Sequence, residues 1–407
     1  MHTSPIDTPG SGDAGGMNVY LAAVSGRLVA RGLEVDLLTR RTSKDQPESV
    51  LLPSGARLRY LTAGPPDTLP KAELASVVDE FSDELASLDR YDVVHSHYWL
   101  SGVAGLALAR ASGAPHVLNL HTVAAMKNAA LAAGDAPEPE FRLRWEADLV
   151  RASTLTIAAT SAEAQAIRQF YSAGPDQLAV IPPGVDRGLF RPDPAPADWF
   201  SHLQPAGLRA AVTGGGYLMM AARAQPLKGH DLAIRALAAI PPAGRPALIL
   251  VGDPSPGHEQ YRGELDRLTG QLGLDGHVWF LPAQSRERLA DLLRGAALLL
   301  APSQSETFGL VTLEAAASGT PTVASAVNGL AEAVSDGVSG RLIAGFDAGE
   351  WASVIGGLLS RPESLGALGV SAQTYAARFD WSVVAAELAG HYRRLAAASR
   401  TGSPCSI

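Results

Sequence analysis

The chain has 407 residues, of which 46% are hydrophobic and 18% are charged, so we expect a folded protein with two domains or one large one. Its formal net charge of −8 argues against a general nucleic-acid or anionic-membrane binder. The single cysteine, Cys405, excludes a disulfide framework and a cysteine metal site, and without a membrane-length apolar run or a signal peptide we expect a soluble, cytoplasmic enzyme.

Short apolar runs alternate with longer amphipathic stretches, which is the pattern of βα units around parallel sheets. In the first half the predicted strands are residues 34–39, 92–97, 116–121 and 154–160. In the second half they are residues 217–222, 247–253, 278–282, 298–302 and 321–326. The fold class is therefore α/β, with two doubly wound, Rossmann-like domains that face each other across a cleft, because ligands bind outside the carboxyl ends of such strands.

A proline-rich stretch separates the two sets of strands. It begins with Ile181-Pro182-Pro183-Gly184-Val185-Asp186 and continues to Pro205, and proline interrupts both helices and sheets. Residues 185–205 are therefore predicted to be a hinge. We expect an N-terminal domain over residues 1–190, a C-terminal domain over residues 191–380 and a final segment over residues 381–407.

A glycine-rich loop, Asp13-Ala14-Gly15-Gly16-Met17-Asn18, precedes a predicted helix over residues 19–30. Glycine lets the backbone approach an anion, and the start of a helix offers free N–H groups and a partial positive charge. A plain turn, with Asp13 or Asn18 as the helix cap, explains the same residues. The loop alone leaves both interpretations open.

Arg223 and Lys228 lie on the loop that follows the first predicted strand of the second half. A planar guanidinium and a point-charge ammonium together suit a diphosphate. Two solvated surface charges are the alternative. Because Lys228 is one of only four lysines in the chain, we favour the diphosphate site.

Two glutamates, Glu306 and Glu314, follow the predicted strand 298–302, one on a loop and one inside the next helix. Eight residues of helix span about 12 Å at roughly 1.5 Å per residue, which is too long for the carboxylate pair of a retaining glycosidase. We therefore expect both carboxylates to accept hydrogen bonds from hydroxyls of a sugar and a ribose. A helix cap and a solvated glutamate are the alternative.

Histidines and cations gather in the first half. His95 and His97 close one predicted strand and His121 closes the next, but no neighbouring carboxylate completes a metal-binding set, so we do not favour a catalytic metal. Three cationic residues, with one phenol and one hydroxyl nearby, suit an anionic acceptor if they converge: Lys71, Lys127, Arg142, Tyr98 and Thr122. Scattered surface charges are the alternative.

Taken together, these motifs resemble those of a known enzyme family. Glu306 to Glu314 is similar to the E-x7-E motif of retaining glycosyltransferases with the GT-B fold, and Arg223 with Lys228, residues 183–186 and Phe379-Asp380-Trp381 fit the same group. Five further segments look like those of D-inositol-3-phosphate glycosyltransferases: residues 2–5, 10–20, 95–102, 127–135 and 284–287. These enzymes move N-acetylglucosamine from UDP to 1D-myo-inositol 3-phosphate in the first step of mycothiol biosynthesis, and the likeness covers nearly the whole chain.

The resemblance implies roles for individual residues. Arg223 and Lys228 would hold the UDP diphosphate, Glu314 the ribose and Glu306 the donor sugar, while His121 would lie beside the reacting centre. The other donor contacts would be Thr8, Pro9, Gly16 and Gln284. The acceptor phosphate would meet Lys71, Tyr98, Thr122 and Arg142. The inositol ring would meet His2, Asp13, Ala14, Gly15, Gly16, Met17 and Asn18.

The resemblance also implies an acceptor-binding first domain, a donor-binding second domain, a C-terminal helix that packs back on the first domain before a disordered tail, and a homodimer. No cofactor would be needed for the chemistry. A structural Mg²⁺ would be held by the backbone carbonyls of Leu293, Arg294, Ala296 and Thr320.

The chain departs from the family pattern at three places. Thr8-Pro9 stands where Gln-Pro is usual, and Ala221-Ala222-Arg223 stands where Val-Gly-Arg is usual. The strand that family members carry before His-Thr-Ser-Pro is not expected here. A related glycosyltransferase with another acceptor, or a non-catalytic protein that binds sugar nucleotides, is the alternative function.

Overall fold

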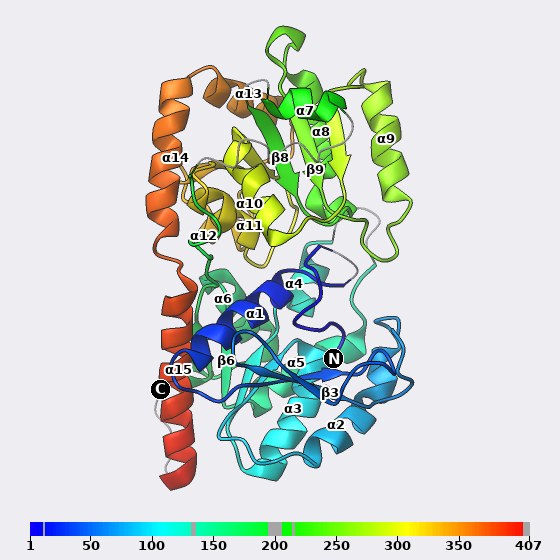
Figure 1. The fold of residues 1–407 in the computed structure, drawn as a ribbon, viewed down its shortest axis with the longest axis vertical. Helices are drawn as coiled ribbons and strands as arrows, with labels where there is room; N and C mark the ends of the chain where they lie inside the picture. The colour runs from blue at the N-terminus through cyan, green and yellow to red at the C-terminus, as the bar shows by residue number, and fades with distance from the viewer. Residues whose placement is uncertain (11–12, 132–135, 194–205, 214–215, 402–407) are drawn as a thin grey trace.

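The computed structural model describes residues 1–10, 13–131, 136–193, 206–213 and 216–401. Figure 1 shows two α/β halves stacked along the long axis, with the last two helices running down one side of both. The second part of the hinge (194–205), the tail (402–407) and parts of the 10–20 and 127–135 motifs lie outside the described residues. No helix in the described ranges combines the length and the apolar character needed to cross a bilayer.

The N-terminal half carries two sheets among its described residues. One has the order β1-β3-β2 and the other the order β4-β5-β6-β7. Their bounds are β1 Asp36–Arg40, β2 Ser49–Leu51, β3 Arg57–Leu61, β4 Val94–His97, β5 His116–Asn119, β6 Leu155–Ala158 and β7 Leu178–Val180. The α-helices of this half are α1 Gly16–Val29, which precedes β1, and α2 Val78–Ala86, α3 Trp99–Ser112, α4 Ala124–Ala129, α5 Glu140–Ala152 and α6 Ser161–Tyr171.

The division into two sheets departs from the single doubly wound sheet that the strand pattern predicts. In the doubly wound order, the first strand of the fold lies between the strands that correspond to β1 and β4. Here residues 1–10 and 13–15 form loop and turn, and β1 and β4 each pair on one side only within the described ranges. A side-chain hydrogen bond from Tyr91 to Asp36, at 2.9 Å, joins the two edges instead.

Alternate side chains of the β4–β7 sheet enter two different cores. Val117, Leu155 and Ile157 pack with α1 and the C-terminal helix α15 (Trp381–Thr401). Their neighbour Leu118 and the residue Ala158 pack with α3 and α5 on the opposite face. Both faces are thus covered, as expected for parallel strands that are buried on both sides.

The C-terminal half has a six-stranded parallel sheet of order β10-β9-β8-β11-β12-β13 in the described residues. Its strands are β8 Tyr217–Ala221, β9 Ala247–Val251, β10 Val278–Leu281, β11 Leu298–Ala301, β12 Thr322–Ser325 and β13 Gly340–Ile343. Its helices are α7 Ala206–Thr213, α8 His230–Ala239, α9 Tyr261–Gln271, α10 Arg286–Gly295, α11 Leu310–Ala317, α12 Leu330–Ala333, α13 Ala348–Leu359 and α14 Pro362–Ala376. This order reverses direction between β8 and β11, and the crevice at such a point binds ligands in open α/β sheets.

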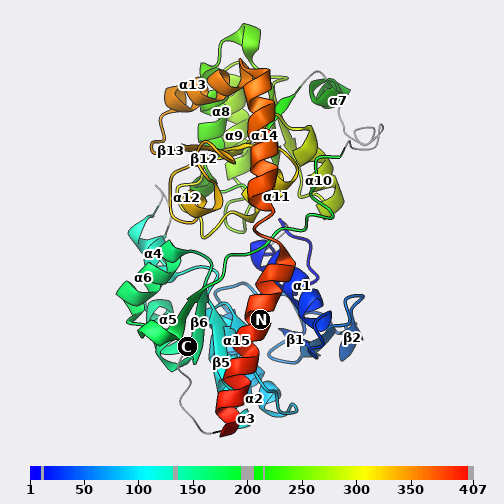
Figure 2. The ribbon, with the colours of Figure 1, turned by 90° about the vertical axis from the view of Figure 1, so that its left-hand side faces the viewer.

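The chain crosses between the halves twice, and the two crossings touch. Val185 N donates to Phe379 O at 2.6 Å, and Val185 pairs with Asp380 in an isolated parallel bridge. A Cβ on Gly184 would lie 2.7 Å from Trp381 N, so only glycine allows this approach. From Trp381 onward α15 returns along α1, end to end with α14 (Figure 2).

All nine predicted strands are confirmed within two residues at either end. The strand pattern missed β2, β3, β7 and β13. Two of these have three residues each, β3 alternates arginine with apolar side chains, and β13 starts with glycine. None is the continuous apolar run that marks a strand buried on both faces.

Gly184→Ala should destabilise the protein, because the added methyl group enters the Trp381 backbone and ring. Overpacking of this kind costs on the order of 1–3 kcal/mol. Thermal unfolding should show a lower midpoint, whereas Gly356→Ala in α13, where a Cβ meets no atom within 4 Å, should leave the midpoint unchanged or raise it. An unchanged midpoint for Gly184→Ala would contradict the tight crossing.

Candidate functional site

Two loops of the C-terminal half meet at the switch point between β8 and β11. Lys228 ends a short 3-10 turn (Pro226–Lys228), and its Nζ lies 2.5 Å from Glu306 Oε2. Gln304 N on the second loop donates to Leu227 O on the first at 2.9 Å. Both charged side chains are mostly buried. The ion pair shows that the lysine predicted to bind the diphosphate and the carboxylate predicted to bind the sugar lie next to each other.

Gly229 and Gly309 make this convergence sterically allowed. Both have positive φ, 76° and 90°, and a Cβ on Gly229 would lie 2.3 Å from Pro302 O. Gly309 is the N-cap of α11, so Glu314 falls inside that helix, as the motif predicts.

Glu314 does not stand alone. Its carboxylate pairs with Arg286 Nη2 at 2.7 Å, and the Arg286 guanidinium lies over the Phe190 ring at 4.6 Å. Arg286 belongs to the 284–287 motif, from which no role for it was predicted. Arg223 is half-buried after β8, and the Gln284 amide donates to Pro282 O at 2.8 Å in its own loop.

The N-terminal loop and α1 approach this end of the C-terminal half. A Cβ on Gly10 would lie 3.3 Å from Ala283 Cβ, and a Cβ on Gly16 would lie 3.2 Å from Leu310 Cδ1. We call the loops that follow β8, β10 and β11 the donor loops. Thr8, Pro9 and Gly16, the other predicted donor contacts, therefore lie on segments next to the donor loops, and Thr8 and Gly16 are exposed.

A further contact joins the halves on another side. Glu332 of α12 accepts hydrogen bonds from Ser161 N and Ala162 N, each at 2.9 Å. These are the first N–H groups of α6, where a negative charge is favourable. No local sequence pattern indicates this cap, because the partners are 170 and 171 residues apart.

The predicted acceptor residues meet around one ring. Lys71 Nζ lies 4.8 Å and the Arg142 guanidinium carbon 5.0 Å from the centre of the Tyr98 ring, and the His2 ring lies 4.4 Å from it. Arg142 Nη2 also donates to the hydroxyl and the carbonyl of Thr122, at 2.9 and 3.1 Å. We call these five residues the acceptor cluster.

The glycine-rich loop is held by Asn18. Its amide oxygen accepts from Gly15 N at 2.9 Å, and its amide nitrogen donates to Thr3 Oγ1 and Ser4 O at 2.8 and 2.6 Å. Asn18 is buried, so the structure supports the helix-cap interpretation for it. Of the remaining residues predicted to meet the inositol ring, Ala14 is buried, Asp13, Gly15 and Met17 are half-buried, and Gly16 is exposed.

Three histidines form a stack at the carboxyl ends of β4 and β5. His97 Nδ1 lies 2.8 Å from His121 Nε2, and the rings of His95 and His97 lie 4.2 Å apart. Tyr20 of α1 contacts the His121 ring edge-on at 5.4 Å. His121 and Tyr98 have positive φ values of 59° and 76°, a strained backbone that occurs often at functional sites.

Burial keeps these rings neutral. It lowers the pKa of His121 to about 3 and that of His95 to about 4, and it holds the pKa of His97 well below its ordinary value. Within the described ranges no group of three or more His, Cys, Asp or Glu side chains has the arrangement of a metal site.

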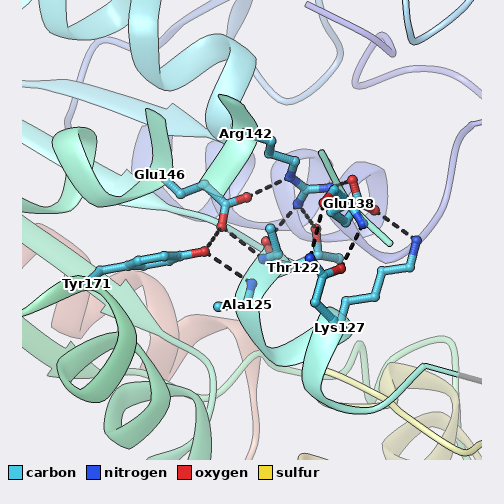
Figure 3. A network of polar contacts seen from close by, with 9 residues as sticks. Thr122, Ala125, Lys127, Glu138, Arg142, Glu146 and Tyr171 are labelled. Atoms are coloured by element: carbon cyan, nitrogen blue, oxygen red, sulfur yellow. Dashed lines mark hydrogen bonds and ion pairs between the residues drawn. The ribbon is translucent and has the colours of Figure 1, made fainter. Parts of the chain in front are cut away.

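A polar network behind the acceptor cluster fixes Arg142 (Figure 3). Arg142 Nε donates to Glu146 Oε1 at 2.7 Å, and Glu146 Oε2 accepts from Tyr171 Oη at 2.6 Å and Ala124 N at 2.9 Å. Glu146 is fully buried. Sequence analysis missed this carboxylate, although its spacing of four residues from Arg142 on a helix was an available signal.

The predicted Mg²⁺ ligands lie between α10 and the end of α11. The carbonyl oxygen of Leu293 accepts from Thr320 Oγ1 at 2.5 Å and from Ala296 N at 3.1 Å. A carbonyl oxygen has two lone pairs, and both have partners here. Leu293 O therefore has no lone pair left for a metal ion in this arrangement, the Mg²⁺ site stays a prediction, and we assign no step to it.

The neutral histidines predict a pH dependence of stability. Burial lowers the pKa of His116, which lies between Ser153 and Ser96 hydroxyls away from the cluster, to about 3. Below about pH 6.5 the unfolded chain binds a proton at this position and the folded chain does not. Between pH 7 and pH 5 this histidine should therefore cost the folded state roughly 2 kcal/mol.

His116→Gln should remove that cost. Relative to the unmutated protein, its free energy of unfolding should improve by roughly 2 kcal/mol between pH 7 and pH 5, measured by denaturant titration. The comparison isolates His116, because Glu163, whose pKa burial raises to about 7, contributes the opposite slope in both proteins. A difference that does not change with pH would mean that His116 titrates normally in the folded state.

Family models and curated relatives match most of the chain. The "Glycosyl transferase 4-like domain" family model matches residues 15–184, and the "Glycosyl transferases group 1" model matches residues 210–374. The D-inositol 3-phosphate glycosyltransferase of Nocardiopsis dassonvillei is 43% identical over 97% of this chain and 92% of its own. That of Frankia alni is 40% identical over 97% of this chain and 98% of its own.

Solved structures have the same fold. Sucrose-phosphate synthase from Thermosynechococcus elongatus superimposes with a TM-score of 0.87 at 28% identity, over 98% of each chain. Anabaena HepE in complex with UDP and glucose has a TM-score of 0.76 at 23% identity, over 95% of this chain and 97% of its own. The predicted GT-B fold is confirmed, and the chain belongs to the D-inositol 3-phosphate glycosyltransferase family.

Proposed function

We propose that this enzyme transfers N-acetylglucosamine from UDP-N-acetylglucosamine to 1D-myo-inositol 3-phosphate, the first step of mycothiol biosynthesis. The observation that carries the proposal is the acceptor cluster, in which Lys71 and Arg142 both lie about the Tyr98 ring. Two cations in the half that lacks the donor loops would bind the phosphate of an anionic acceptor, whereas a neutral acceptor offers no charge for them to bind.

The names of relatives support this assignment. The curated relatives are named for D-inositol 3-phosphate, and HepE has been solved with UDP-glucose and with UDP. We propose that residues 1–190 bind the acceptor, residues 191–380 the donor, and that the helix from residue 381 ties the two together. The homodimer and the cytoplasmic location stay predictions.

The donor loops suit a departing diphosphate. Lys228 and Arg223 follow the central strand β8, and the charge that develops on the diphosphate oxygen would be stabilised by these two cations. In the structure Lys228 is paired with Glu306, so the donor would separate this pair and leave Glu306 to accept hydrogen bonds from the sugar.

The transfer itself would proceed on one face of the sugar. The acceptor hydroxyl oxygen forms a bond to the anomeric carbon on the face that the diphosphate leaves, and the departing diphosphate oxygen takes the hydroxyl proton. His121 is neutral and held by His97, so it would position the sugar by a hydrogen bond. Packing of the halves together would exclude water and limit donor hydrolysis.

Lys228→Ala should reduce transfer at least ~10²-fold, because one preorganised cation at the leaving group is lost. Release of UDP from the donor in the presence of the acceptor measures the rate. Lys44→Ala removes an exposed lysine of the first half and should transfer at the normal rate. Near-normal turnover by Lys228→Ala would contradict the proposal that Lys228 binds the diphosphate.

The acceptor is tested by a direct comparison. Purified enzyme with UDP-N-acetylglucosamine should use 1D-myo-inositol 3-phosphate at least ~10-fold more efficiently, in kcat/KM, than unphosphorylated myo-inositol, since each phosphate–cation contact stabilises binding by about 1.5–3 kcal/mol. Lys71→Gln should narrow that ratio by raising KM for the phosphorylated acceptor only. Equal efficiencies with both acceptors would contradict the proposed substrate.

A further inference from the structure

The carboxylate of Glu138 lies between Arg142 of the acceptor cluster and Lys127 of α4 (Figure 3). Its Oε1 accepts from Lys127 Nζ at 2.8 Å, and its Oε2 lies 2.8 Å from Arg142 Nη1. Burial opposes ionisation, but the two cations outweigh it and hold the pKa of Glu138 below its ordinary value. An anion therefore already lies on the cations that sequence analysis connected with an anionic acceptor.

Arg142 is nearly saturated as a donor. A guanidinium has five N–H groups. Nε donates to Glu146, Nη2 donates to the carbonyl and the hydroxyl of Thr122, and Nη1 pairs with Glu138, so four contacts are in use. Because guanidinium–phosphate contacts are frequently bidentate, such a contact requires one of these acceptors to leave.

Glu138 is the acceptor that can leave. The side chain of Glu146 is 0% exposed and also binds Tyr171 and Ala124, whereas the side chain of Glu138 is 18% exposed. Asn128 holds the backbone of Glu138, donating to its carbonyl at 3.1 Å and accepting from its N–H at 2.7 Å. Rotation of the side chain alone would therefore release both cations without moving the main chain.

The charges around this point also cancel. Lys127 and Arg142 bring two positive charges, and Glu138 and Glu146 bring two negative ones. While Glu138 stays in place, Lys71 is therefore the one cation of the acceptor cluster without a counter-charge among these groups. When Glu138 moves away, a second positive charge becomes available for a phosphate.

We propose that Glu138 is a specificity-determining residue whose carboxylate competes with the acceptor's phosphate for Arg142 and Lys127. This proposal rests on the proposed function, because it assumes that Arg142 binds the anionic group of the acceptor. A neutral acceptor does not displace the carboxylate, so Glu138 stays paired with Arg142 and Lys127 until an anion arrives.

Glu138→Gln tests the competition, because the amide keeps the size of the side chain and removes its charge. Calorimetric titration should show roughly three- to tenfold tighter binding of 1D-myo-inositol 3-phosphate and of inorganic phosphate, with unchanged binding of UDP and of myo-inositol. Glu140→Gln, two residues away and exposed, is the matched control and should bind every ligand as the unmutated enzyme does. Thermal unfolding checks that both variants fold.

Equal or weaker phosphate binding by Glu138→Gln would overturn the proposal and make Glu138 a residue that merely positions Arg142. A crystal structure of the unmutated enzyme with 1D-myo-inositol 3-phosphate is a second test that needs no variant. A carboxylate that has left Arg142 and Lys127 supports the competition, and retention of both contacts contradicts it. If the enzyme uses neutral inositol equally well, the proposed acceptor fails, but inorganic phosphate still decides whether Glu138 competes for the two cations.

Discussion

The site depends on the place where the two crossings of the chain touch. Gly184 lies so close to Trp381 that a single added carbon would overlap the Trp381 backbone, and Val185 is hydrogen-bonded to Phe379 beside it. This contact fixes where the chain leaves the first half and where it returns as α15. Because the acceptor cluster and the donor loops lie on different halves, their relative placement follows from this crossing, and the Glu332 cap on α6 secures it from another side.

The chemistry of the site follows from compensated charge. Lys228 is paired with Glu306, Arg286 with Glu314, and Arg142 with Glu138 and Glu146. A cation in a partly buried place needs a partner, since removing it from water is costly. We therefore expect an anionic ligand to bind by replacing one of these carboxylates as the partner of a cation. The buried histidines need no ionic partner, because burial keeps their rings neutral and the rings stack on one another.

Backbone geometry places these groups at the ends of strands. In the C-terminal half the order of strand connection reverses between the parallel neighbours β8 and β11, and the loops that follow these two strands carry Lys228 and Glu306. In the N-terminal half Tyr98 directly follows β4, and His121 lies just after the adjacent strand β5. Both residues have positive φ, so their side chains do not continue the alternation of the strands. Strain of this kind persists only where the surrounding packing fixes it, here α1, α3 and the stacked rings.

The sequence by itself determined nine of the parallel strands, because buried strands are continuous apolar runs, and it determined which glycines, lysines and glutamates follow them along the chain. It did not show β2 or β7, which are too short to form such runs, and it did not show that the strands of the first half divide into two sheets. Only the tertiary structure decided which charges meet. Glu138 lies 11 residues from Lys127, and Glu306 lies 78 residues from Lys228. A motif specifies side-chain chemistry along the chain, but pairing depends on the loops and helices that bring distant residues within hydrogen-bonding distance.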